Sequence, residues 1–269
     1  MILIDMKEKI LHNLNAECPW RDTLHWYSVT DSTNTRAKEM ARMGAPHGTV
    51  LIAGHQTGGR GRMGRTFHSP EGKGVYLSVI LRPRCKPEEL MHLTCAVGVA
   101  AAEAVETVSG IQPQLKWIND LVVGTKKLGG ILVEMSVDKG LVDYAIIGIG
   151  INCGQTQDAF APEIAHMATS LSLVSGAAIP PEKLAAALVE AFWRMDPILL
   201  TQKDRLMAAY KSRCITLGKS VQVIRADSLR PGKALDLDME GGLLVEYEDG
   251  SREIVSSGEV SVRGMYGYV

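Results

Sequence analysis

The segment GHQTGGRGRMGRTFHSPEGKGVY, residues Gly54–Tyr76, is the most informative part of the chain. Between Gly54 and Gly74 it holds three arginines and one lysine against one glutamate, a local charge of +3 in a chain whose formal net charge is −1. Seven of these residues are glycine, so the backbone can approach a ligand closely and turn N–H groups towards it. Arginine adds planar, permanently charged forks that suit phosphate and carboxylate oxygens. A strand is predicted to end near Gln56 and another to start at Val75, and this framing by a sheet favours an anion-binding loop over a solvated flexible one.

Two familiar nucleotide motifs are excluded by their context. Gly59–Thr66 reads G-x-x-x-x-G-R-T, close to a P-loop, but a P-loop must open into a helix whose N-terminus holds the phosphates. The sequence FHSPEG that follows cannot start a long helix. The G-x-G at Gly148–Gly150 lacks the third glycine and the downstream acidic residue of a dinucleotide site.

Composition places the chain among ordinary globular proteins. It has 269 residues, 46% hydrophobic and 22% charged, enough for one large domain and a small one. The near-zero net charge provides no overall field for nucleic acid or anionic lipid. Five cysteines without a C-x-x-C pair argue against a disulfide scaffold or a zinc knuckle and predict a reducing cytoplasm. The longest apolar stretches, around Thr94–Ala102 and Ala145–Cys153, are expected to be too short to span a bilayer.

Periodicity predicts an α+β fold, a mixed β-sheet backed by helices, followed by a small SH3-like β-barrel. Predicted strands are Leu24–Val29, Val50–Gly54, Val75–Leu81, Gln114–Trp117, Leu121–Val123, Gly130–Met135 and Val142–Ile149; predicted helices are Thr35–Met43, Pro87–Val108, Pro181–Met195 and Asp204–Lys211. From Ile215, short strand runs separated by Gly and Asp turns predict the barrel: Val221–Arg225, Lys233–Asp238, Leu243–Tyr247, Arg252–Val255 and Glu259–Arg263. The expected organisation is a short extension at 1–23, the α+β domain at 24–214 and the SH3-like domain at 215–269.

Two further segments could contribute to a site. Lys126 and Lys127 are adjacent at a strand start and face opposite ways, so at most one of them can point into a site. Two hairpin lysines in water are the alternative. Asn119-Asp120 is equally consistent with a plain turn, whereas the Asn152 amide, at the end of a buried strand, could read a base or ribose edge.

Five motifs together resemble those of the biotin protein ligase family. They are DSTN (Asp31–Asn34), GHQTGGRGRMGRTFHSP (Gly54–Pro70), KWIND (Lys116–Asp120), KKLGGILVE (Lys126–Glu134) and GIGIN (Gly148–Asn152). They occur in the family's order and spacing, and the resemblance covers about Leu24 to Arg263. The GRGRMG loop with the downstream K-L-x-G-I is specific to the family, whereas DSTN and GIGIN alone are not.

The resemblance implies a two-step ligase reaction with ATP, and with Mg²⁺ that is bound to the substrate. The carboxylate of biotin attacks the α-phosphate of ATP to give biotinyl-5′-adenylate, and a lysine of a biotin carboxyl carrier protein domain then attacks the adenylate. The acceptor would belong to a biotin-dependent carboxylase such as acetyl-CoA carboxylase. The resemblance is compatible with a homodimer but does not decide between monomer and dimer, and it implies no specific DNA partner for a chain of this kind and no membrane.

The resemblance also implies site residues, with no metal held by the protein itself. The expected biotin-binding residues are Ser32, Thr33, Asn34, Gln56, Gly59, Arg60, Gly61, Arg62, Lys127 and Gly130. The expected ATP-binding residues are Arg62, Arg65, Phe67, Asn119 and Asn152. Lys127 and Arg62 are the expected catalytic residues, and the Gly/Arg loop is expected to act as a lid that orders on binding.

This chain departs from the family pattern at two places. Ile118 stands where the family commonly has proline, beside Trp117 and Asp120, which match. The stretch 1–23 contains one short helical pattern, too little for the three-helix DNA-binding domain of the family's larger members. The expectation is therefore a ligase without repressor activity.

Two alternatives remain open at this stage. A lipoate or octanoate transferase would use the same fold, although the GRGR loop argues against it. A nucleic-acid-binding module using the Arg/Gly loop is disfavoured by the neutral net charge and by Phe67 being the loop's lone aromatic.

Overall fold

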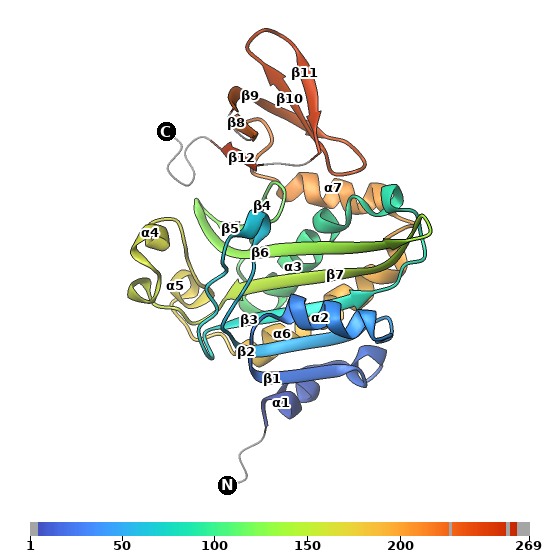
Figure 1. The fold of residues 1–269 in the computed structure, drawn as a ribbon. Coiled ribbons are helices and arrows are strands. Elements are labelled where there is room, and N and C mark those ends of the chain that lie inside the picture. The colour runs from blue at the N-terminus through green and yellow to red at the C-terminus, as the bar shows by residue number, and fades with distance from the viewer. Residues whose placement is uncertain (1–4, 226–227, 257–258, 263–269) are drawn as a thin grey trace.

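A seven-stranded mixed sheet forms the larger part of the molecule, as Figure 1 shows. The computed structural model describes residues 5–225, 228–256 and 259–262. The strands lie in the order β1-β2-β3-β7-β6-β5-β4; β1 pairs with β2 in parallel, and the other ladders of this sheet are antiparallel. Their bounds are β1 Leu24–Thr30, β2 Thr49–Gln56, β3 Gly74–Leu81, β4 Gln114–Lys116, β5 Asp120–Val123, β6 Lys126–Asp138 and β7 Leu141–Asn152. The predicted mixed sheet is confirmed.

Helices cover the two faces of this sheet unequally. On one face lie α3 (Leu93–Ser109) and α6 (Pro181–Met195), flanked by α1 (Met6–Asn13) and α7 (Lys203–Arg213), whereas α2 (Thr33–Arg42) crosses part of the other face (Figure 1). Alternation along β7 assigns the faces, because Ile147 and Ile149 belong to the large core under α3 and α6. Ile146 belongs to the small core under α2. Gly148 and Gly150 therefore share the α2 face, where they leave room above the sheet.

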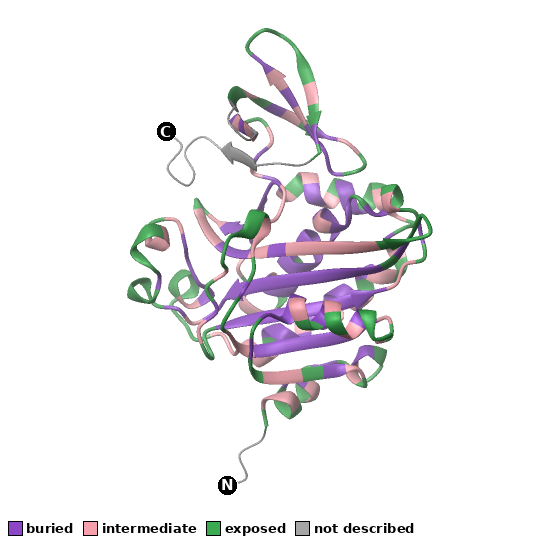
Figure 2. Ribbon diagram, viewed as in Figure 1, coloured by how far each residue is buried: buried purple, intermediate pink, exposed green. Residues whose placement is uncertain are grey.

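A second, five-stranded antiparallel sheet lies at the C-terminal end, beside α7 and β4 (Figure 1). Its order is β11-β10-β9-β8-β12, with β8 Ser220–Arg225, β9 Ser228–Leu237, β10 Leu243–Tyr247, β11 Arg252–Val255 and β12 Glu259–Val262. Val221 and Val223 of β8 are buried at alternate positions, as is expected for a strand with one apolar face, and Val245 of β10 is buried as well. Figure 2 shows both buried and exposed segments in this sheet. The predicted strand end at Arg263 lies outside the described residues.

The predicted helix Pro87–Val108 is wrong at its start. Pro87–Leu90 form a 3₁₀ turn, and α3 begins only at Leu93. The turn closes on itself, because Glu89 N–H donates to the Lys86 carbonyl at 3.1 Å and the Glu89 carboxylate accepts from Lys86 N–H at 2.8 Å. By length and composition the stretch 87–109 would suffice to cross a membrane, contrary to the expectation of short apolar runs, but 67% of its most apolar window is buried inside the fold. It is a core helix.

Residues 153–175 form a connection for which the sequence patterns gave no elements before Ser170. Short helical turns occupy Gln157–Ala159, Pro162–Ala165 and Leu171–Ser175. The segment returns to the main sheet at Lys127, whose N–H donates to the Met167 carbonyl at 2.7 Å and whose carbonyl accepts from Thr169 N–H at 2.8 Å. This contact brings residues 160–168 beside the α2 face of the sheet.

Candidate active site

A cavity of about 540 Å³ opens on the α2 face of the sheet. It is lined by residues from α2, β2, the Gly/Arg loop, β5–β7 and the 160–168 segment. Every residue predicted for the site lines it except Gly59: Ser32, Thr33, Asn34, Gln56, Arg60, Gly61, Arg62, Arg65, Phe67, Asn119, Lys127, Gly130 and Asn152. The structure thus brings together motifs that lie up to 120 residues apart in the sequence (Ser32 to Asn152).

The floor of the cavity depends on two glycines of β7. A Cβ on Gly148 would lie 2.0 Å from the Asn34 side-chain oxygen, and a Cβ on Gly150 would lie 2.4 Å from the Phe67 ring. Real Cβ atoms do not approach other heavy atoms so closely, so glycine at these two positions allows Asn34 and Phe67 to pack directly against β7.

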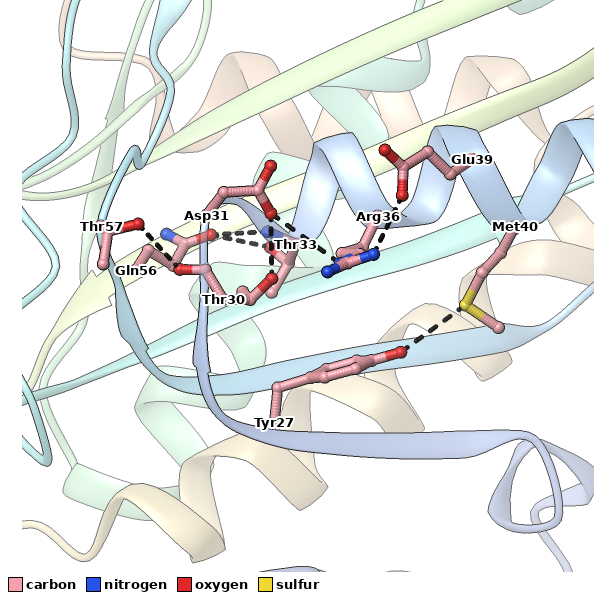
Figure 3. Close-up of polar contacts among 9 residues, drawn as sticks. All are labelled: Tyr27, Thr30, Asp31, Thr33, Arg36, Glu39, Met40, Gln56 and Thr57. Atoms are coloured by element: carbon pink, nitrogen blue, oxygen red, sulfur yellow. Dashed lines mark hydrogen bonds and ion pairs between the residues drawn. The ribbon is translucent and has the colours of Figure 1, made fainter.

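One end of the cavity is a hydrogen-bonded cluster at the start of α2. Gln56 Oε1 accepts the Thr33 backbone N–H at 2.8 Å and lies 3.1 Å from Thr33 Oγ1, as Figure 3 shows. Gln56 of β2 thereby satisfies a free N–H of the helix N-terminus, in place of a cap from Ser32, whose side chain makes no cap bond. Gln56 Nε2 donates to Ser69 Oγ at 2.9 Å, and Ser69 Oγ donates to the Phe67 carbonyl at 2.9 Å. The polar end of the site is therefore tied to the base of the loop.

The Gly/Arg loop is folded as a hairpin beside the cavity. Phe67 N–H donates to the Gly59 carbonyl at 2.9 Å and Gly61 N–H to the Arg65 carbonyl at 2.7 Å. Met63 and Gly64 form the tip with positive φ angles of 54° and 75°. A Cβ on Gly59 would lie 2.3 Å from the Phe67 carbonyl oxygen, so Gly59 allows the hairpin strands to pair rather than lining the cavity. The following residues start no long helix, as the exclusion of a P-loop predicts.

Cationic groups gather at the opposite end. Lys127 Nζ lies 2.6 Å from Asp120 Oδ1, and Arg62 donates to Asn119 Oδ1 at 3.3 Å. Lys127 lines the cavity and Lys126 does not, in agreement with the predicted opposite orientation. These fixed charges can hold carboxylate and phosphate oxygens.

The two asparagines of the site are already engaged within the protein. Asn119 Nδ2 donates to the Ile131 carbonyl at 3.0 Å, which turns its oxygen towards Arg62. Asn152 Nδ2 donates to the Thr169 carbonyl at 3.0 Å, and its oxygen accepts from Gln155 Nε2 at 2.9 Å. Asn152 therefore ties the 167–169 segment to β7, and a direct role in nucleotide binding stays a prediction.

The sequence reasoning missed several lining residues. The sequence is consistent with Asp120 as a plain turn residue, but its carboxylate pairs with Lys127. The KWIND motif, which contains Asp120, is the feature of the sequence that indicates a site role. Lys116 and Trp117 also line the cavity, and the peptide bond between Trp117 and Ile118 is cis. The apolar wall formed by Phe160, Ile164, Met167 and Ala168 had no signal, since its segment has no regular periodicity.

Comparisons with known proteins agree with this geometry. The family model "Biotin/lipoate A/B protein ligase family" matches residues 26–152, and "Biotin protein ligase C terminal domain" matches residues 216–263. The bifunctional ligase/repressor BirA of Bacillus spizizenii is 37% identical over 235 residues, which cover 87% of this chain and 72% of that protein. The chain belongs to the biotin/lipoate A/B protein ligase family. Another relative, the biotin–[acetyl-CoA-carboxylase] ligase of Mycobacterium tuberculosis, is 31% identical over 92% of this chain and 91% of its own length.

A solved structure of the family extends the likeness to the fold. The biotin protein ligase from Aquifex aeolicus, in complex with biotin and ATP, superposes with a TM-score of 0.75 at 31% identity, over 89% of this chain and 98% of that one.

Proposed function

We propose that this chain is an ATP-dependent biotin–protein ligase, which activates biotin as biotinyl-5′-adenylate and transfers it to a lysine of a biotin carboxyl carrier domain. The observation that carries the proposal is the cavity itself, which has a polar end at α2 and a cationic end around Lys127. The chain that surrounds this cavity has the fold of an enzyme whose structure was solved with biotin and ATP. Biotin has the matching form, with a cyclic urea at one end and a carboxylate at the other.

In the first step a carboxylate oxygen forms a bond to the α-phosphorus and pyrophosphate leaves. Both reactants are anions, so Lys127, Arg62 and Arg65 offset their repulsion. Asp120 holds the Lys127 ammonium at 2.6 Å, and Arg62 is directed by Asn119. No protein nucleophile takes part.

In the second step an acceptor lysine amine attacks the acyl carbonyl, AMP leaves, and the amine loses a proton. The adenylate is a mixed anhydride that water destroys, so the hairpin lid protects it. Among the described residues, no group of three or more His, Cys, Asp and Glu side chains could hold a metal ion. Mg²⁺ bound to the ATP phosphates would neutralise charge that develops on them.

ATP–pyrophosphate exchange tests the proposal, with biotin, lipoate, octanoate and no acid in parallel. Exchange with biotin alone is the expected result. Exchange with lipoate or octanoate instead would keep the fold and change the substrate, and no exchange with any acid from folded protein with Mg²⁺ would contradict the proposal.

The proposed acceptor is the carrier domain of a carboxylase, and the proposed location is the cytoplasm. The proposed domains are a catalytic domain at 24–214 and an SH3-like C-terminal domain at 215–269. The proposal includes no specific DNA binding, since the formal net charge is −1. A sequence-specific DNA footprint at nanomolar protein would contradict that part alone.

A further inference from the structure

The carboxylate of Glu134 lies beside the cavity, on the α2 face of the sheet, and does not line it. It forms an ion pair with Lys38, accepts from Asn34 Nδ2 at 3.0 Å, and lies 3.8 Å from Arg60 Nη1. Burial raises the pKa of Glu134, but the hydrogen bonds from Lys38 and Asn34 and the charges of Lys38 and Arg60 outweigh burial, so the net pKa is lowered. At neutral pH Glu134 is therefore a carboxylate, which can only accept hydrogen bonds.

This carboxylate fixes the orientation of the Asn34 amide. Because Glu134 can only accept, Asn34 must turn Nδ2 towards it, and a weaker contact from Nδ2 to the Leu132 carbonyl at 3.3 Å agrees. Asn34 Oδ1 then faces Ser78 Oγ at 2.7 Å. An amide oxygen has no proton, so the single hydroxyl proton of Ser78 must be donated to Asn34.

The direction of the Ser78 hydrogen bond determines which hydrogen bonds are open to Thr33, which lines the cavity. Ser78 Oγ lies 2.8 Å from Thr33 Oγ1, but its proton is already committed to Asn34. Thr33 can donate to Ser78 or to Gln56 Oε1, yet within this chain of contacts no group donates to Thr33. Its oxygen therefore keeps acceptor capacity for an N–H group of a bound molecule.

We propose that Glu134 is a positioning residue, which sets the direction of the hydrogen bonds from Asn34 through Ser78 so that Thr33 accepts an N–H of the substrate. The inference rests on the proposed function, in which that N–H belongs to the cyclic urea of biotin. Glu134 acts at a distance, through Asn34 and Ser78.

The isosteric variant Glu134→Gln tests this. A glutamine can donate, so Asn34 can turn its Nδ2 towards Ser78, and the Ser78 proton can then be donated to Thr33, whose oxygen is left with one acceptor position for the substrate instead of two. We expect the KM for biotin in ATP–pyrophosphate exchange, and the biotin Kd by calorimetry, to rise about tenfold, the effect of about one lost hydrogen bond. The KM for ATP should change less than about twofold, a split that general loosening of the fold would not produce.

A double-variant comparison identifies the route. In a Ser78→Ala background there is no proton to redirect, so adding Glu134→Gln should change the biotin KM less than about twofold. If Glu134 acted on the lid through Arg60, or through stability alone, its effect would persist in that background. Lys38→Gln is the matched control, because it removes the neighbouring charge and leaves the bond between Glu134 and Asn34 in place.

Glu134→Asp keeps an acceptor-only group and should stay closer to wild type than Glu134→Gln. An unchanged biotin KM in folded Glu134→Gln, equal rises for biotin and ATP, or a Glu134→Gln chain that does not fold would each overturn the inference. Wild-type protein without biotin-dependent exchange would instead overturn the proposed function.

Discussion

At the scale of single residues, the contact between Lys127 and Asp120 decides what the cationic end of the site can do. The Asp120 side chain is only 11% exposed and the Lys127 side chain 35%, so the ammonium is held by a nearly buried carboxylate while one side of it stays open. A partner of this kind restricts the ammonium to the cavity, which suits the role proposed for Lys127, to stay with the biotin oxygen as the carboxylate becomes an acyl phosphate.

Lys127→Met should therefore reduce the rate of biotin-dependent ATP–pyrophosphate exchange on the order of 10²–10³-fold. Methionine keeps the length and apolar stem of the side chain and removes the charge. Lys126→Met is the matched control on the same strand, and it should stay within twofold of wild type because Lys126 does not line the cavity. A Lys127→Met rate within tenfold of wild type would exclude Lys127 from the chemistry.

Gly150 is a second residue whose effect can be measured. An alanine Cβ would lie 2.4 Å from the Phe67 ring, so Gly150→Ala should displace Phe67. Phe67 is an expected ATP-binding residue, and if its ring stacks on the adenine, the displacement should raise the KM for ATP about tenfold. Gly154, just after β7, provides the control, because a Cβ there would have Lys73 Cδ, at 3.8 Å, as its nearest neighbour. Gly154→Ala should therefore leave the KM values for biotin and ATP unchanged. Equal behaviour of the two variants would contradict this reading of the floor.

The sequence identifies the residue types at the site better than their partners. The family resemblance implied Lys127, Arg62 and Asn119 as site residues, but not that Asp120 holds Lys127. That contact depends on an irregular register between β5 and β6, where Asp120 pairs with Gly130 and Val122 with Lys127. A bulge of one residue leaves no distinct sequence pattern, so side-chain partners across it could not be read in advance.

At the scale of elements, the turn between β9 and β10 holds the strand end that carries Trp117. Trp117 Nε1 donates to the Gly241 carbonyl at 2.8 Å, and Trp117 N–H donates to Thr216 Oγ1 at 3.0 Å. Asp238 Oδ1 accepts from Gly242 N–H at 2.7 Å and stiffens the turn. Because Trp117 lines the cavity, the C-terminal sheet contributes to the shape of the site through this turn.

Gly241→Ala should weaken this contact. Gly241 has a φ of +85° and a Cβ would lie 3.0 Å from Cys95 Sγ, so alanine adds both strain and crowding. We expect a loss of about 1–2 kcal/mol in the free energy of unfolding, measured by denaturant melting, and a higher KM for ATP. Gly250→Ala has a similar φ of +78° with nothing within 4 Å, so it should carry the strain without the change in KM. A raised KM in both variants would show that strain alone is responsible.

Several regular elements were predicted closely, short strands between clear turns as well as a long helix. Strands β3, β10 and β11 and helix α6 match the prediction to within one residue, because their apolar alternation or helical spacing is complete. The β6–β7 hairpin was predicted too short, since pairing between the two strands extends it past the apolar residues to Asp138 and Leu141. The turns at 157–165 were missed because each is only three or four residues long and has no regular apolar periodicity.

At the scale of the whole molecule, two separate sheets build one site, and only the first was assigned to it from sequence. The fold class was predictable from alternating patterns together with the family resemblance. The contact of the C-terminal turn with Trp117 was not predictable, because it joins residues 124 positions apart through a backbone carbonyl. Tertiary contacts of that kind leave no local signal.

The contact between the start of α3 and the C-terminal turn also predicts how the stability of the whole fold responds to acid. His92 is fully buried between α3, the Leu199 carbonyl and the C-terminal turn. Its Nε2 donates to the Leu199 carbonyl at 2.8 Å, and its Nδ1 has no hydrogen-bond partner among the residues that the structure describes. Burial lowers the pKa of His92 below its ordinary value; the hydrogen bond to Leu199 offsets part of this decrease, and the charge of Lys203 lowers the pKa further while that of Glu240 raises it. Between that lowered pKa and the usual value of about 6.5, the unfolded chain binds a proton that the folded chain does not, so stability falls as pH falls below about 6.5. Glutamine can keep the donor to Leu199 without titrating, so His92→Gln should flatten the decline of the melting temperature between pH 7 and pH 5. A decline as steep as in wild type would assign the acid sensitivity to other groups.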